Sequence, residues 1–252
     1  MFRFFRQLRH KLRAEKNIHR YLLYALGEIV LVVLGILIAI QIDGMNEARK
    51  LKQVEIDSLS EILTGLEDTL DEVELALEQD RRYRDCNYKI LDYMDNRKPY
   101  DKSLDTCFGV YYWSPTVQLT TSAYEQLKLR GLEIISNESL RKDLTELFDT
   151  RFDVLKSEVE LWDSQLLLST LYPLHTNHFR KYFPAEWQIY EDEFAKPVDY
   201  EGLLDNQQFK NVLAEIISLR NWSVKTNEVL ENEIQVLIGK IKAELKHLKG
   251  EP

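Results

Sequence analysis

The sequence predicts an all-α protein in which a single N-terminal transmembrane helix continues into an elongated helical bundle. Three observations support this fold class. Residues 21–42 form an apolar run in which Glu28 is the one side chain that can carry charge at neutral pH. Apolar residues recur at steps of three and four through most of the later chain, as on the buried face of a helix. Only nine Gly and six Pro occur among 252 residues, which favours helices over a β-sandwich or barrel.

The apolar run of residues 21–42 is long enough to cross a bilayer. A helix of that length extends roughly 33 Å, compared with about 30 Å for the hydrocarbon core. A cleavable signal peptide would have a shorter apolar core and a small-x-small cleavage site, whereas this run ends in Ile-Ala-Ile-Gln at residues 38–41. We therefore expect an uncleaved signal-anchor.

Residues 1–20 form a basic leader before the span, with seven Lys or Arg and one acid, Glu15. The flank after residue 42 mixes both signs. Basic residues are retained on the cytoplasmic side, so we expect a cytoplasmic N-terminus and residues 43–252 on the outer side. The leader is amphipathic and is expected to lie on the anionic inner leaflet, with docking of a cytoplasmic partner as the alternative.

The part of the chain after the span is acidic. The whole chain carries a net charge of −9, and because the leader is basic, residues 43–252 are more acidic than this total. Their number is sufficient for one elongated domain with its own core or for a pair of helical subdomains. Nucleic-acid binding needs a basic surface, so the sequence argues against a nucleic-acid partner.

A first long helix is predicted over about residues 45–94, with Gly44 as a candidate break. Its apolar stripe has steps of three or four residues and comprises Leu59, Ile62, Leu66, Leu70, Val73 and Leu77. Such a stripe needs a helical partner, as in a coiled coil. Residues 95–99 should end the helix, because Pro99 and the turn-forming residues before it interrupt the hydrogen-bond ladder.

The next segment, to about residue 119, has aromatic residues 111–113 bracketed by Gly109 and Pro115. This predicts an irregular cap packed on helix ends, with a ligand-stacking loop as the alternative. A short helix should follow from Ser122 to Arg130. Ser122 and Glu125 have the spacing of a capping box, and Gly131 is expected to be its left-handed cap.

Two more long helices are predicted over residues 137–171 and 205–248. The first starts at Ser136-Asn137, and Pro173 should stop or kink it. Residues 173–204 are aromatic without a sustained period and predict a second cap. The last helix ends in lysines, which suit a helix C-terminus. The outer part is therefore expected to be a bundle of three long helices and a short one.

Glu28 gives the apolar run a distinct side. Steps of 100° per residue place Ala25, Glu28, Val32, Gly35 and Ala39 on one narrow face. Gly35-xxx-Ala39 is a small-xxx-small pattern, which lets helix backbones approach closely. We expect this face to contact another copy of the chain or a different membrane protein. The remaining alternatives are a proton-titrating site and a Glu28 side chain that reaches back to the interface.

Other candidate sites are weak. Cys86 and Cys107 fall in the outer part, where a disulfide is permitted, and two free thiols are the alternative. His175-x-x-His178, with Glu186, Glu191 and Asp192 nearby, lacks a third metal ligand at a recognised spacing. Ser139-x-x-Lys142 has no companion hydrolase motif and is interpreted as a helix N-terminus. We expect no enzymatic activity, no catalytic residue, no metal and no cofactor.

Residues 24–39, together with Phe4-Phe5-Arg6 before them and Asn46-Glu47 after them, resemble the signature of an uncharacterised family of Bacteroidota inner-membrane proteins. Residues 121–127, with Gly131-Leu132 and Leu140-Arg141, are similar to the middle segment of that family. One departure is Met45, where such proteins often carry Trp. The resemblance implies an inner (cytoplasmic) membrane location and a periplasmic domain, and it supplies no catalytic residue.

Taken together, these features predict a structural or interaction protein, in which an inner-membrane anchor displays an acidic helical bundle to the periplasm. Two alternatives stay open. A ligand sensor or transducer would bind its ligand at the aromatic caps, residues 111–113 and 187–194. An accessory subunit of a proton-coupled membrane complex would use Glu28.

Overall fold

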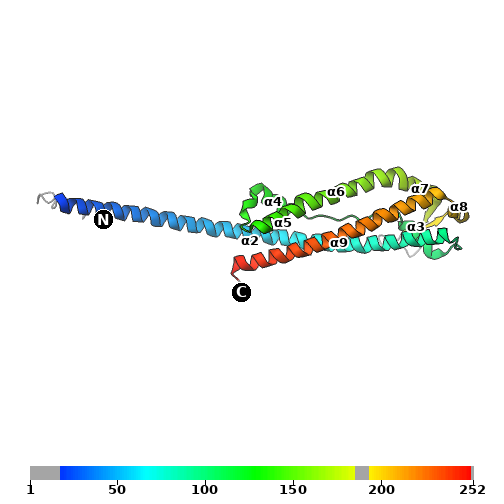
Figure 1. Ribbon diagram of the computed structural model, residues 1–252, viewed down its shortest axis with the longest axis horizontal. Coiled ribbons are helices and arrows are strands. Elements are labelled where there is room, and N and C mark those ends of the chain that lie inside the picture. Colours follow the sequence, from blue (N-terminus) through cyan, green and yellow to red (C-terminus); the bar gives the residue numbers. More distant parts are fainter. Residues whose placement is uncertain (1–17, 185–192, 251–252) are drawn as a thin grey trace. The chain divides into compact units, whose positions relative to one another are not determined.

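The computed structural model describes residues 18–184 and 193–250, and helices dominate them (Figure 1). The predicted all-α class, with a long apolar N-terminal helix, is confirmed. Most of the predicted leader, residues 1–17, lies outside the described residues. The chain forms two compact units, Met1–Val54 and Glu55–Pro252.

Helix α2, Ile18–Asp95, begins in the first unit and ends in the second. The predicted break at Gly44 is wrong, since the helix continues through this glycine. A single glycine costs only about 1 kcal/mol in a helix interior, so it need not end one. The predicted end at residues 95–99 is correct. Arg97 there has a positive φ of 45°, and the Lys98 amide closes the helix by donating to the Tyr93 carbonyl at 2.9 Å.

The second unit continues α2 from Glu55 and adds a series of helices that follow one another without a break. These are α5 (Glu138–Thr145), the π-helix η3 (Glu146–Arg151), α6 (Phe152–Leu161), the π-helix η4 (Trp162–Leu171) and α7 (Tyr172–His178). Pro173 was predicted to stop or kink this helix, and the stop is wrong, because helical residues continue to His178. Pro173 occupies the first turn of α7, where its missing N–H is tolerated, and the chain becomes extended only at Phe179.

Helix α9, Gln207–Lys249, runs antiparallel to α2 and to the α5–η3 segment (Figure 1). The ion pairs show this direction, because the residue number of the α9 partner falls as the residue number of the partner on the other helix rises. Against α2 they are Asp95–Lys210 at 3.4 Å, Arg81–Glu228 at 3.0 Å and Glu67–Lys242 at 2.7 Å. Against α5 and η3 they are Asp143–Lys240 at 2.7 Å and Arg151–Glu233 at 3.0 Å. Exposed pairs stabilise little, so the apolar core holds the helices together.

Between α2 and α5 the chain forms η1 (Lys102–Leu104) and α3 (Asp105–Val110), then residues 113–121, which belong to no helix or strand and are here called the return segment. It leads to α4 (Ser122–Arg130) and η2 (Leu132–Ile134), so the predicted short helix has the right bounds. The capping box is wrong. Ser122 is the first helical residue, so it cannot be the N-cap that a capping box requires. The N-cap is Thr121, whose side chain makes no capping hydrogen bond. Gly131 has φ 113° and ψ 123°, a positive φ outside the left-handed helical region.

The segment predicted as a second cap contains a small sheet and a short helix. β1 (Phe179–Tyr182) pairs antiparallel with β2 (Phe194–Pro197), so that Phe179 lies opposite Pro197. Helix α8 (Tyr200–Leu204) then leads to α9. Residues 185–192, between the strands, lie outside the described residues, and they include most of the predicted aromatic stretch 187–194.

Two apolar clusters fill the described part of the second unit. The first core lies where α2, α4, α5, η3 and α9 meet, and α2 contributes Leu59 to Leu77 to it. The second core lies at the other end of the bundle, where α3, α7, β1, β2 and α8 close over Ile90 and Met94 of α2. Helix α9 contributes to both, with Val224 to Leu248 in the first and Phe209 to Ile217 in the second.

Candidate functional site

The predicted packing face lies on the exposed part of α2 in the first unit. Ala25, Glu28, Val32, Gly35 and Ala39 are all helical, as predicted. The large apolar side chains between Leu22 and Ile42 are 48–70% exposed. A Cβ added to Gly35 would meet no atom within 4 Å. Within the described chain, α2 is the one helix long and apolar enough to cross a membrane.

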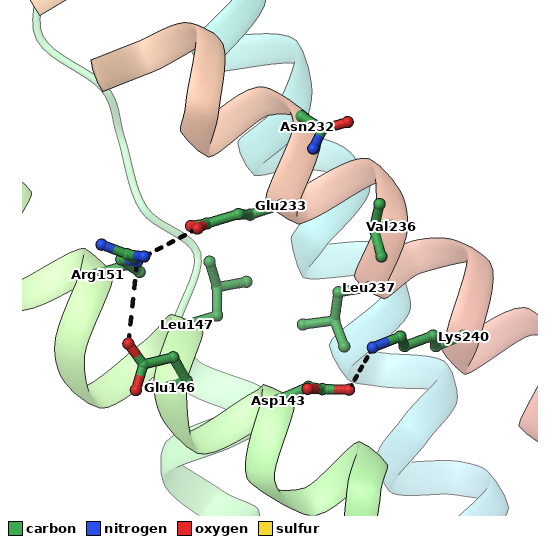
Figure 2. Close-up of a pocket in the computed structure, with 9 residues that line it drawn as sticks. All are labelled: Asp143, Glu146, Leu147, Arg151, Asn232, Glu233, Val236, Leu237 and Lys240. Atoms are coloured by element: carbon green, nitrogen blue, oxygen red, sulfur yellow. Dashed lines mark hydrogen bonds and ion pairs between the residues drawn. The ribbon is translucent and has the colours of Figure 1, made fainter. Parts of the chain in front are cut away.

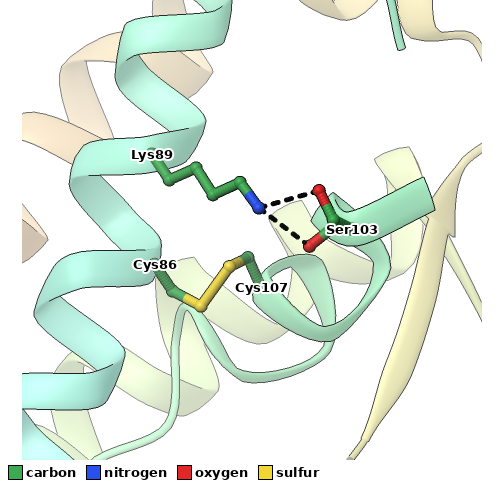
Figure 3. Close-up of a disulfide and its surroundings, with 4 residues drawn as sticks. All are labelled: Cys86, Lys89, Ser103 and Cys107. Carbon is green, nitrogen blue, oxygen red and sulfur yellow. Dashed lines mark hydrogen bonds between the residues drawn. A yellow bond between two sulfur atoms is a disulfide. The ribbon is translucent and has the colours of Figure 1, made fainter. Parts of the chain in front are cut away.

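Cys86 of α2 and Cys107 of α3 form a disulfide, with 4.9 Å between their Cα atoms (Figure 3). The sequence left a disulfide and two free thiols as alternatives, and the structure contains the disulfide. Beside the bridge, Lys89 Nζ donates to Ser103 Oγ at 2.8 Å and to the Ser103 carbonyl at 3.2 Å. A loop closed at a sequence separation of 21 is worth about 3 kcal/mol on the chain-entropy estimate. The bridge fixes α3 onto the end of α2.

The aromatic residues after α3 are core residues for the most part. Tyr111 and Tyr112 are buried in the second core, and Trp113 is 43% exposed. This agrees with the packed cap rather than with the ligand-stacking loop, because buried rings offer no face to a ligand. His175 packs among them, with 4.5 Å between its ring centroid and that of Tyr112 and 5.3 Å to that of Phe179.

His175 and His178 do not form a shared site. Within the described part of the chain, neither ring nitrogen of the buried His175 has a hydrogen-bond partner, and burial, aided by the charge of Lys181, lowers its pKa to about 4. His178 Nε2 lies 3.1 Å from Asn206 Nδ2 instead. Glu186, Glu191 and Asp192 lie outside the described residues. Among the residues that the structure does describe, no group of three His, Cys, Asp or Glu could hold a metal.

A second polar group, which the sequence did not reveal, lies where α3 meets the sheet. Asp105 is buried and accepts hydrogen bonds from the hydroxyls of Tyr100 and Tyr182, the latter at 2.6 Å. The bond to Asp105 favours the protonated phenol and raises the pKa of Tyr182 to about 12. Both tyrosines therefore stay neutral donors at physiological pH. The group joins β1 to α3 and has the chemistry of a structural contact.

A third group, the polar layer, consists of Asp80 and Tyr83 on α2 and Arg220 and Ser223 on α9. The Asp80 carboxylate accepts from Arg220 Nη1 at 2.7 Å and from Ser223 Oγ at 2.6 Å. Arg220 Nη2 also donates to the carbonyl of Trp113, where the return segment begins. The guanidinium lies over the Tyr83 ring, 5.3 Å from its centroid. The Asp80 and Arg220 side chains are 0% and 1% exposed.

The polar layer is not evident in the sequence, because Asp80 is followed by charged residues that are typical of an exposed helix face: Arg81, Arg82, Arg84 and Asp85. One signal was present. Asp80 stands three residues after Leu77, where the apolar stripe of α2 would have its next member. A charged residue at a core position indicates a buried partner.

A surface cleft of about 250 Å³ lies between the α5–η3 segment and α9 (Figure 2). Its charged side chains come from both helices and pair across it. Lys240 bonds to Asp143 at 2.7 Å, and Arg151 bonds to Glu233 at 3.0 Å. Leu147, Val236 and Leu237 form its apolar floor. Glu146 also lies near Arg151, at 3.9 Å, so the charged side chains of the cleft form a set of surface ion pairs that join the two sides.

A comparison with protein families finds a match over residues 28–171, which is more than half of the chain. The chain belongs to the DUF6090 family. This family is described as one of unknown function, which confirms that part of the resemblance seen in the sequence. Comparisons with curated proteins and with solved structures gave no significant match.

The DUF6090 match begins at Glu28 and ends at Leu171, the last residue of η4. It covers four of the five predicted packing residues, the disulfide and the Asp80 half of the polar layer. Helix α9, which supplies Arg220, follows the matched region. The matched region of this DUF6090 protein thus contains most of the exposed apolar part of α2 and one side of the polar layer.

Proposed function

We propose that this DUF6090 protein is a single-pass, membrane-anchored structural or interaction component without catalytic residues of its own. In this proposal α2 crosses the inner membrane, the N-terminus is cytoplasmic, and residues 43–252 form a periplasmic helical domain. One observation carries the proposal: the Leu, Ile and Val side chains of α2 from Leu22 to Ile42 are about half to two-thirds exposed. Burying one such side chain is worth about 1.5–3 kcal/mol, which a bilayer supplies.

The packing face suggests how the anchor makes contacts. Gly35 and Ala39 leave room for a second backbone, and Glu28 can form a hydrogen bond with a partner helix in a medium without water. We propose a second copy of the chain as this partner, because a face on one helix can meet its own image in a symmetric dimer.

The test is the mass of the protein in mild detergent, measured by size-exclusion chromatography with light scattering. We expect an oligomer for the wild type and for Glu28→Gln, which keeps the hydrogen-bonding capacity. Glu28→Leu should shift the mass toward the monomer, because it removes the polar contact. Leu37→Ala, on the opposite face of the helix, is the matched control and should not change the mass.

Two results would contradict the proposal. A wild-type monomer whose mass Glu28→Leu leaves unchanged would exclude the homo-oligomer. Release of the protein from membranes by alkaline carbonate would exclude the anchor itself. A different result would support the proton-coupled alternative. In that case a multi-span membrane protein would co-purify with the chain, and Glu28→Gln would abolish the proton-coupled activity of the complex.

A further inference from the structure

The polar layer interrupts an otherwise apolar interior. The first core takes α2 residues only up to Leu77 and α9 residues only from Val224 onward. The second core takes buried residues from Ile90 of α2 and as far as Ile217 of α9. Asp80 lies between Leu77 and Ile90 on α2, and Arg220 lies between Ile217 and Val224 on α9. The buried ion pair therefore separates the two cores.

Stability alone does not account for such a pair. Removing two charges from water is costly, and well-packed apolar residues in their place are often as stable or more stable. Breaking the pair by removing one partner is different, because a lone buried charge is strongly destabilising. The pair therefore penalises wrong alignments more than it stabilises the right one.

A slide of α9 along the axis of α2 would affect the apolar core and the ion pair differently. In the first core a slide of one helical turn, about 5.4 Å, exchanges one aliphatic contact for another of similar volume, which costs little. The same slide moves Arg220 toward Ala76 or Arg84, neither of which has a carboxylate. Asp80 and Ser223 would lose their bonds, and Arg220 would also leave the Trp113 carbonyl.

We propose that the Asp80–Arg220 pair is a register lock, which sets the axial alignment of α9 on α2 and holds the start of the return segment to both. The lock makes the two cores one mechanical unit. A displacement of α2 along its axis is passed to α9 and to the return segment at this layer.

The test uses two spin labels, at Glu78→Cys on α2 and Lys246→Cys on α9, both exposed positions that are not among the four residues of the layer. Maleimide labels are attached under non-reducing conditions, so that the native disulfide stays intact. The labels are offset along the bundle axis, so a one-turn slide changes their separation by about 5 Å. Pulsed electron paramagnetic resonance measures the distance distribution.

We expect one narrow distance for the wild type. The double variant Asp80→Leu with Arg220→Met removes both charges and keeps similar volumes. It should retain its helical circular dichroism signal and melt within a few degrees of the wild type or above it, while its distance distribution broadens or splits by about 5 Å. The matched control, Arg81→Met with Glu228→Gln, removes an exposed pair on the same two helices and should change neither.

Three outcomes would overturn the lock. A single, unshifted distance in the double variant would mean that apolar packing alone sets the register. Loss of the helical signal would make the pair a requirement for folding. Equal broadening in the exposed control would assign the register to surface charge.

Discussion

At the scale of single residues, the second unit contains polar side chains in apolar surroundings, with different consequences. The Asp80 carboxylate accepts a hydrogen bond from Arg220, and the Asp105 carboxylate accepts from two phenols. His175 differs, since among the described residues neither of its ring nitrogens has a hydrogen-bond partner and its exposure is 2%. Such a group costs about 1–3 kcal/mol. Protonation of His175 would in addition place a charge in the second core.

His175 predicts a loss of stability as the pH falls. Its pKa is about 4 in the folded protein and 6.5 in the unfolded chain, so below pH 6.5 the unfolded state binds the proton first. The penalty grows as the pH falls to about 4 and then stays constant, at about 3 kcal/mol. Phe suits the surrounding rings, so the His175→Phe variant should have a higher free energy of unfolding than the wild type at pH 7. The difference between the two proteins should grow by about 3 kcal/mol at pH 4. Urea unfolding at both pH values measures this difference, and a difference that stays constant would contradict the prediction.

At the scale of elements, the sequence predicted the helices well, because apolar spacing and turn residues are local signals. Residues 122–130 and the end of α2 at the cluster before Pro99 are examples. Pro173 was misinterpreted, because its effect depends on whether it falls in a first turn or in a helix interior. The strands Phe179–Tyr182 and Phe194–Pro197 are too short to show a period. Arg220 and Asp80 are 140 residues apart, and only the antiparallel packing brings them together.

The contact between α3 and β2 gives a prediction at this scale. A Cβ on Gly109 would lie 2.0 Å from the Glu193 carbonyl oxygen, so Gly109→Ala must move β2 away from α3. We expect a loss of about 1–3 kcal/mol in the free energy of unfolding. Gly239→Ala, in α9, meets nothing within 4 Å and should instead stabilise by about 0.5–1 kcal/mol. Urea denaturation compares the two variants, and equal effects would show that the close approach is unimportant.

At the scale of the whole molecule, the proposed topology assigns the disulfide to an oxidising compartment. Cytosolic thiols are kept reduced, so a stable bridge between Cys86 and Cys107 needs the outer side of the membrane.

This topology predicts the result of alkylation. Protein extracted from cells under denaturing conditions and alkylated without reductant should show no mass shift, whereas prior reduction should add two alkyl groups. Deleting the span while keeping residues 43–252 in the cytoplasm should yield two reactive thiols. Intact mass spectrometry measures both. Free thiols in the membrane-bound protein would contradict a periplasmic location.

The antiparallel course of α9 has a mechanical consequence for the second unit. Because α9 returns along α2, Leu59 and Leu248 belong to the same end of the bundle. A force that pulls the start of this unit away from its C-terminal end would peel the two helices apart one contact at a time, rather than shear all contacts together. The first core would open before the load reached Arg220, and the disulfide would protect the turn beyond it. The protein is thus built to yield gradually at one end and to resist at the other.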